Sequence, residues 1–358
     1  MTRRVHAGAW WAWAVFLAFA ATRTTNPILL GLIVAVAMLV VATHRPPAAG
    51  TGFRLYLGLA LVVVAIRIGF RILLGGDFGD RVLVTLPEFG GSGGIALGGP
   101  VTLEETLSGA YEGLRLATII ICVGAANTLA DPRRLLASFP KALGGVAAAV
   151  AVALSLAPQL IESVNRVRAA RRLRGEQAGR VRAFRALLVP VLEDTLSRSM
   201  ALAASMDGRG FGRDGSIGSV PMPARIVAYA GLGSVLAGMS LLISTRAVGF
   251  AALLLVAGLV ATVAALVIRG RGIARSRYRP DSWGGNEWAI SFSGAAVAAG
   301  MVVLATVSPA QLHPALEPLT WPVAGPLGLG AVLVAALPAL ITPRRPSPVL
   351  AAPERLAA

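Results

Sequence analysis

The chain has 358 residues, of which 56% are hydrophobic, and its mean hydropathy is +0.72. Soluble domains are about 45–50% apolar, so this composition excludes an ordinary soluble globular protein. The formal net charge is +16, but the basic residues cluster between apolar blocks, as in membrane proteins, so the charge does not indicate a nucleic-acid partner. The single cysteine, Cys122, excludes an intrachain disulfide.

Apolar blocks of roughly 15–22 residues predict an all-α, polytopic membrane helix bundle, because about 20 residues cross the hydrocarbon layer as a helix. The blocks cover residues 8–21, 27–43, 55–74, 107–130, 144–158, 226–243, 247–268, 288–307 and 321–341. We interpret the first block as an uncleaved helix rather than a signal peptide. Its Trp10, Trp11 and Trp13 are typical of an interfacial aromatic anchor. The lone Cys122 is expected to serve packing.

The loops indicate which side of the membrane they face. Residues 75–106 are rich in Gly, and their charged residues are mainly acidic, which favours the outside. The segment RVLVTLPEF within them alternates like one strand of a small hairpin. Basic residues flank block 144–158 on both sides, and basic loops face the cytoplasm. Either this block or an earlier one therefore does not cross; we favour the first. The assignment of loops to the two sides of the membrane is consistent if the remaining eight blocks all cross it.

This pattern divides the chain into five parts. They are N-terminal transmembrane helices (1–158), a pair of cytoplasmic amphipathic helices (159–213), transmembrane helices (214–279), additional transmembrane helices (280–342) and a cytoplasmic tail (343–358).

Residues 159–213 are too basic for the hydrocarbon layer and predict two amphipathic helices. Pro158 suits the first turn of the first helix, and Gly175 is a natural stop. The second helix is expected over about 181–206, where Pro190 should kink it. Apolar stripes at helical spacing give each helix one apolar side: Leu160, Ile161, Val164 and Val167 in the first, and Leu188, Leu192, Leu196, Met200 and Met206 in the second.

Each predicted helix ends on an Arg followed by a Gly, at Arg174-Gly175 and Arg209-Gly210. Two interpretations remain open. The basic segment could lie on anionic lipid headgroups. Alternatively, each guanidinium, left uncovered by the glycine, enters an acidic groove of a partner and makes bidentate hydrogen bonds.

Several stretches resemble, in chain order, the transmembrane T component of energy-coupling factor (ECF) importers, the EcfT-like or CbiQ-like family. They are Asn26-Pro27, AANTLADPRRLLASFPKAL, ALSLAPQLIESVNRVRAARRLRG and SMALAASMDGRGFG. The resemblance covers about residues 3–279 and does not reach the blocks after 280. In that family, two X-Arg-X motifs at the ends of coupling helices dock onto two ABC-type ATPase subunits.

The resemblance therefore implies two ATPase-docking motifs, Leu173-Arg174-Gly175 and Gly208-Arg209-Gly210. The family usually has Ala at the first position, and Leu173 and Gly208 depart from it. Because Arg and Gly are kept, we expect docking to survive. The residues expected to support the coupling helices are Pro158, Glu162, Arg171 and Pro190.

The function implied by the resemblance is that of an energy-coupling subunit in a bacterial-type plasma membrane. It would transmit ATP hydrolysis in two partner ATPases to a substrate-binding membrane S component, for uptake of a vitamin or of a transition-metal ion such as cobalt. The alternative is a self-contained secondary transporter, but the sequence shows neither an inverted repeat nor a midplane polar site. A membrane enzyme is a third, less favoured class.

Other motifs give little support for catalysis or for a cofactor. The glycine run at 90–94 lacks the Lys-Ser/Thr of a Walker A motif, so we expect no nucleotide site and no enzymatic activity. His6, His44 and His313 lack metal-ligand spacing. Charges inside the apolar blocks are functional candidates by default. They are Arg67, Arg71, Glu112 and Arg115. We expect Arg67 to pair with Glu112, and Arg71 to snorkel toward the membrane surface.

Overall fold

The computed structural model describes residues 5–44, 50–74, 79–89, 97–138, 144–173, 180–210, 222–244, 248–271 and 283–341. These residues are mostly helical, with one two-stranded hairpin. They group into two compact units, and each is described by itself. The first contains Met1–Leu135 and Asp281–Ala358, and the second contains Leu136–Pro280.

Seven of the described helices are long and apolar enough to cross a membrane. They are α2 (Pro27–His44), α3 (Gly50–Leu74), α4 (Leu103–Leu129), α6 (Gly144–Leu173), α8 (Met222–Ser244), α9 (Val248–Arg271) and α10 (Gly285–Val307). A further apolar helix, α1 (Ala7–Thr22), has 16 residues. The predicted class, an all-α polytopic membrane bundle, is confirmed.

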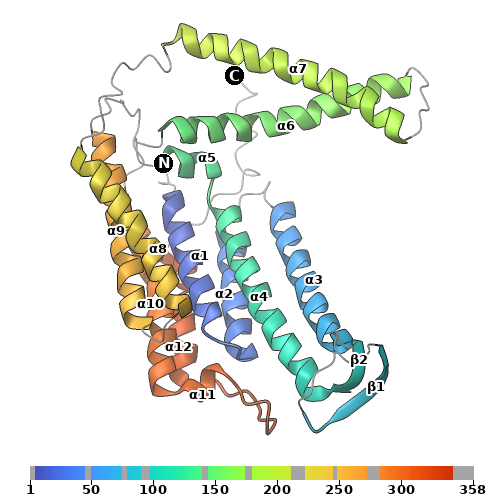
Figure 1. Ribbon diagram of the computed structural model, residues 1–358, viewed down its shortest axis with the longest axis vertical. Coiled ribbons are helices and arrows are strands. Elements are labelled where there is room, and N and C mark those ends of the chain that lie inside the picture. Colours follow the sequence, from blue (N-terminus) through green and yellow to red (C-terminus); the bar gives the residue numbers. More distant parts are fainter. Residues whose placement is uncertain are drawn as a thin grey trace, which may run out of the picture. The chain divides into compact units, whose positions relative to one another are not determined.

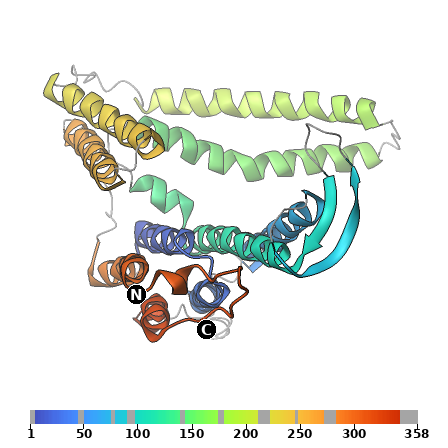
Figure 2. The same ribbon diagram turned by 60° about the horizontal axis from the view of Figure 1, so that its bottom comes forward.

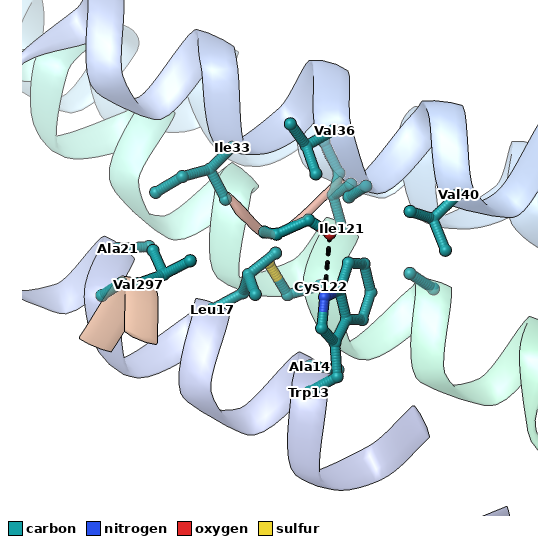
Figure 3. Packing of buried hydrophobic residues seen from close by; sticks show 14 of the residues in the cluster. Trp13, Ala14, Leu17, Ala21, Ile33, Val36, Val40, Ile121, Cys122 and Val297 are labelled. Carbon is teal, nitrogen blue, oxygen red and sulfur yellow. Dashed lines mark hydrogen bonds between the residues drawn. The ribbon is translucent and has the colours of Figure 1, made fainter. Parts of the chain in front are cut away.

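The core of the first unit lies among α1, α2, α4 and α10 (Figures 1 and 3). Trp13 is fully buried there, and its Nε1 donates a hydrogen bond of 3.2 Å to the carbonyl of Ala335. Gly294 of α10 makes this burial possible, because a Cβ at that position would lie 2.9 Å from Trp13 Cα. Trp10 is buried as well. The prediction that Trp10 and Trp13 anchor the chain at the membrane surface is therefore wrong.

The expected hairpin in residues 75–106 is present. Strands β1 (Val82–Phe89) and β2 (Leu97–Thr102) pair in antiparallel register at the end of the α3–α4 pair (Figure 1). The second strand leads directly into α4, where the hydroxyl of Thr102 accepts a hydrogen bond of 3.3 Å from Glu105 N and caps the helix. The hairpin thus links α3 to α4 and fixes where α4 begins.

The expected helix start at Pro158 is wrong, because Pro158 lies inside α6, which is continuous from Gly144 to Leu173. A proline in a helix interior loses the hydrogen bond to the carbonyl four residues earlier, at a cost of about 3 kcal/mol. The helix-forming residues on both sides of Pro158 continue the helix past this loss. The predicted boundary at 158 therefore does not coincide with the end of a helix. The short helix α5 (Pro132–Ala137) precedes α6.

The block at 321–341 is not a single transmembrane helix, contrary to expectation. After α11 (Pro309–Leu312), residues 321–325 form no regular element, and two short helices follow, α12 (Pro326–Val334) and α13 (Leu337–Ile341). Pro338 cannot donate to the carbonyl of Val334, so the helix cannot pass this point without losing a bond. The chain instead tightens, and Ala335 N donates to Val332 O at 3.0 Å. With nine residues, α12 is about 14 Å long, too short to span the bilayer by itself.

The second unit contains α6, α7 (Arg180–Gly208) and the α8–α9 hairpin. Glycines bring α8 and α9 close together. A Cβ at Gly231 would lie 2.9 Å from Thr262 N, and one at Gly258 would lie 2.8 Å from Val235 N. Small residues of this kind allow close backbone packing between membrane helices.

Candidate functional site: the α6–α7 helix pair

Helices α6 and α7 form one antiparallel pair, which crosses in the view of Figure 1 and runs side by side in that of Figure 2. They have 30 and 29 residues. The second helix begins at Arg180 and ends at Gly208, and Pro190 lies inside it. Two helices are therefore present over residues 159–208, as the sequence predicted, although the first of them begins earlier, at Gly144.

A single carboxylate links the two helices. Asp194 of α7 accepts a hydrogen bond of 2.7 Å from the hydroxyl of Ser163 on α6. Arg166 of α6 lies 3.4 Å away, and Arg198 of α7 donates from Nε at 2.9 Å. Ser163 and the neighbouring Val191 are buried. Asp194 thus sits where the helices meet and neutralises arginines from both.

The electrostatic surroundings favour the ionised form of Asp194. Hydrogen bonds from Arg198 and Ser163, together with the charges of Arg198 and Arg166, hold the pKa of this carboxyl below its ordinary value. The sequence reasoning missed this link. The contact between Asp194 and Arg198 could have been predicted from the sequence, because the two residues are four apart on one helix face. The contacts with α6 could not, because they depend on how the helices pack.

The apolar stripe of α7 does not take part in the contact with α6. Leu188, Leu192, Leu196 and Met200 are all exposed. The helices contact each other through the polar groups around Asp194 and through Val191 instead. The stripe therefore remains open to an apolar partner or to the membrane surface.

The C-terminal end of α7 has the geometry that its glycines predicted. Arg209 is exposed, and its N–H donates to Met206 O at 3.1 Å. Gly210 follows with φ of +74°, a left-handed conformation that favours glycine and terminates helices. At Gly208 an added Cβ would have no neighbour within 4 Å. Arg209 therefore lies exposed at an abrupt helix end.

The C-terminal end of α6 carries the other motif. Leu173, its last residue, is 91% exposed, whereas Arg174 and Gly175 lie outside the described residues. Three of the expected support residues, Pro158, Glu162 and Pro190, are exposed, and Arg171 is half-buried. A role for these four residues remains a prediction.

The antiparallel arrangement places Leu173 and Gly208, the first residues of the two predicted motifs, at opposite ends of the pair. Helix α6 ends at Leu173, and α7 ends at Gly208. A helix of 29 residues is about 43 Å long.

The charges in the apolar helices divide into two groups. Arg67 and Arg71 of α3 both lie within ion-pair distance of Glu112 of α4, and the pair Arg67–Glu112 is the one expected from the sequence. Arg115 is not part of this group: its Nε is buried without a hydrogen-bond partner.

Burial, together with the charges of Arg115 and Arg23, lowers the pKa of His313 in the loop after α11.

Among the described residues, no group of three or more His, Cys, Asp or Glu side chains could hold a metal ion. Cys122 is buried in the core of the first unit.

Comparison with known protein families gives a match to CbiQ, described as cobalt transport protein, over residues 1–220. The chain belongs to the CbiQ family. The matched region includes both Arg-Gly motifs and all of α7, and it ends before α8 begins. A search of curated proteins finds no match.

Membership of the CbiQ family, together with the apolar helices, makes this chain a multi-pass membrane component of a transport system. CbiQ is a transport family and not a known catalytic one. The helices from α8 onward lie outside the matched region, which therefore does not include residues 221–279, the last part of the stretch over which the resemblance was expected.

Proposed function

We propose that this CbiQ-family chain is the energy-coupling T component of an ECF-type importer in a bacterial-type plasma membrane. Two ABC-type ATPase subunits dock at the ends of the α6–α7 pair, one at Leu173-Arg174-Gly175 and one at Gly208-Arg209-Gly210. The observation that carries this proposal is that α6 ends at Leu173 and α7 ends at Gly208, at opposite ends of one antiparallel pair. Each ATPase subunit then binds its own end of the α6–α7 pair.

The link through Asp194 suits a coupling element. Because Ser163 and Arg166 of α6 bind the carboxylate on α7, a movement imposed on the end of one helix is passed to the other. The exposed stripe of α7 gives the moving pair an apolar side. We infer that this side contacts a substrate-binding membrane S component, and that ATP-driven movement of the pair shifts that subunit in the lipid bilayer.

The family description names cobalt transport, which supports a transition-metal ion such as cobalt as the cargo, with a vitamin as the other candidate. In this proposal the S component binds the cargo. The T component itself needs no cofactor, because ATP is hydrolysed on the partner subunits.

The test is co-expression of the chain with the ABC-type ATPases encoded beside its gene, followed by pull-down and an uptake assay. Arg174→Glu and Arg209→Glu should each lower ATPase retention at least about tenfold, because a carboxylate in an acidic groove replaces a charge-assisted hydrogen bond with repulsion. Arg168→Glu is the matched control. It makes the same charge change at an exposed arginine of α6 that no glycine follows, and it should retain the ATPases.

Two glycine substitutions test whether the backbone conformation at the end of α7 matters for docking. Gly208→Ala should retain the ATPases, since the added Cβ meets nothing within 4 Å and alanine favours helix. Gly210→Ala should weaken retention, because φ of +74° costs a residue with a Cβ about 1 kcal/mol. If the segment only rested on lipid headgroups, all three charge reversals would have similar effects and neither glycine would matter, which would refute the docking proposal.

A further inference from the structure

A half-exposed charge cluster lies between α3 and α4, outside the coupling helices. Arg67 Nη1 is 3.4 Å from Glu112 Oε2, and Arg71 Nη2 is 3.6 Å from Glu112 Oε1. The side chains of Arg67, Arg71 and Glu112 are 46%, 36% and 37% exposed. Among the described residues, Glu112 is the only carboxylate within ion-pair distance of either arginine. Two guanidinium groups thus share one carboxylate, and within the part of the chain that the structure describes one positive charge of the cluster has no carboxylate of its own.

Two glycines of α4 hold the arginines in place. A Cβ at Gly109 would lie 2.8 Å from Arg71 Cγ, and one at Gly113 would lie 3.2 Å from Arg67 Cβ. The stems of both arginines therefore lie directly on the surface of α4, and their guanidinium groups are directed to the same place. A site held in this way loses less side-chain entropy when a ligand binds than two free arginines would.

The depth of the cluster points to the headgroup region. Arg71 and Arg67 precede the end of α3 at Leu74 by about 4.5 Å and about 10.5 Å along the helix axis. Helix α3 is apolar over the 23 residues Gly52–Leu74, or about 35 Å, against about 30 Å for the hydrocarbon layer. With the helix centred in that layer, Arg71 lies near its edge and its side chain reaches the phosphates, whereas Arg67 lies about 8 Å inside the layer and its long side chain extends toward them. A net positive charge at this depth is stabilised by an anion.

The surface around the cluster is apolar. On α3, Leu59, Val62 and Ile66 are exposed, and they lie deeper in the membrane than Arg67 and Arg71. Within the first unit, α3 packs chiefly on α4 and β2 and lies at an edge (Figure 1). This surface suits acyl chains beside a charged headgroup.

We propose that Arg67 and Arg71 bind the headgroup phosphate of an anionic phospholipid, with its acyl chains along Leu59, Val62 and Ile66, which lie deeper in the membrane. Arginine pairs bind phosphate through several charge-assisted hydrogen bonds. The excess positive charge selects a headgroup that is itself negative over one whose phosphate is balanced by an ammonium group. A phosphate is present at this depth in every bilayer, whereas the carboxylate of a partner helix would have to be placed there by that partner.

The experiment uses the full chain purified in detergent, with phosphatidylglycerol and phosphatidylcholine as probes. Bound lipid is counted by native mass spectrometry. The buried Cys122, the only cysteine of the chain, reports unfolding when a thiol-reactive dye labels it on heating. Wild type should retain phosphatidylglycerol and gain more thermal stability from it than from phosphatidylcholine. Arg67→Gln/Arg71→Gln should lower the affinity for phosphatidylglycerol about tenfold.

Glu112→Gln separates lipid binding from a purely structural role. If the cluster binds a phosphate, removing its carboxylate should leave phosphatidylglycerol retention intact or raise it, whereas a structural ion pair predicts that every variant only destabilises. Because the double variant could fold poorly, Arg71→Lys gives a second measurement, in which the charge is kept and retention should be intermediate. Arg54→Gln, at the other end of α3, should leave binding at this site unchanged.

Three outcomes would overturn the proposal. The first is equal retention of phosphatidylglycerol by wild type and Arg67→Gln/Arg71→Gln, which would favour an acidic partner helix as the ligand of the arginines. Equal stabilisation by both lipids would remove the headgroup selectivity. Displacement of phosphatidylglycerol by millimolar inorganic phosphate would mean that the site takes the free anion and not the lipid.

Discussion

Asp194 is the residue on which the α6–α7 contact most depends. Its carboxylate accepts hydrogen bonds from Ser163 on α6 and from Arg198 on its own helix. Arg198 of its own helix lowers the pKa of Asp194 most, and Ser163 and Arg166 of α6 lower it further, so ionised Asp194 is bound more strongly in the paired helices than when they are apart. This contribution to the pairing is present above the ordinary pKa of an aspartate, about 3.9, and is lost as the pH falls through the lowered value.

We predict that acidification separates α6 from α7, and that Asp194→Asn weakens the pairing at neutral pH and removes its pH dependence. The measurement is the distance between nitroxide labels on cysteines placed at Asn165 and Ser197, two exposed positions; the buried Cys122 should stay unlabelled in the folded chain. Glu193→Gln, at an exposed neighbour, is the control and should retain the wild-type profile. An unchanged distance in Asp194→Asn would show that other contacts hold the pair.

At the scale of elements, glycines decide how closely α3 and α4 pack. A Cβ at Gly113 would lie 3.0 Å from Val64 Cα, and one at Gly124 would lie 2.7 Å from Tyr56 Cβ. The contact at Gly113 is with backbone, which cannot rotate away as a long side chain does. Together with Gly109, these residues place small side chains where the second helix approaches, a recurring arrangement in membrane helix pairs.

Gly113→Ala should therefore destabilise the α3–α4 pair by about 1–3 kcal/mol, the usual cost of overpacking. It should also lower the temperature at which Cys122 becomes reactive to a thiol dye. Gly69→Ala on α3 is the matched control: its added Cβ meets nothing within 4 Å, so its melting temperature should not fall. Equal behaviour of the two variants would mean that α3 and α4 are not held at this separation.

Whole-molecule integrity depends on contacts between segments far apart in the chain. Asn26 is fully buried between α1 and α2. Its Nδ2 donates to Gln311 O at 2.7 Å and to Val323 O at 3.0 Å, and its Oδ1 caps α2 through Ile28 N at 3.0 Å. Trp13 adds a further link, to Ala335. The helices from α10 onward, which lie beyond the matched family region, therefore complete the core of the first unit.

Asn26→Ala should lower the free energy of unfolding of the first unit by about 2 kcal/mol, because it leaves the carbonyls of Gln311 and Val323 without the donor from Asn26 and removes a helix cap. Dye labelling of Cys122 would detect this as a melting temperature several degrees lower. Asn127→Ala is the control. It loses one exposed hydrogen bond, from Nδ2 to Tyr56 Oη at 2.8 Å, and should cost no more than about 1 kcal/mol. Equal melting temperatures would mean that the C-terminal helices are not held through Asn26.

Local chemistry explains which features the sequence predicted well. Pro27 opens α2 and Gly210 follows the end of α7, as the conformational preferences of proline and glycine require. Apolar length predicted the membrane helices in the same way. The errors at Pro158 and in block 321–341 have one origin: a proline weakens a helix by a fixed amount, and its surroundings decide whether the helix continues, as α6 does, or stops, as α12 does.

The sequence by itself determined that this is a helical membrane protein with a basic pair of helices ending in Arg-Gly, because length, periodicity and helix-terminating residues act locally. Only the tertiary structure decided that Trp13 is buried in the core, that Arg71 as well as Arg67 forms an ion pair with Glu112, and that Asp194 links α6 to α7. Each of these contacts joins separate helices. Which side chains meet depends on how closely two helices pack, and glycine positions set that distance only once the partner helix is known.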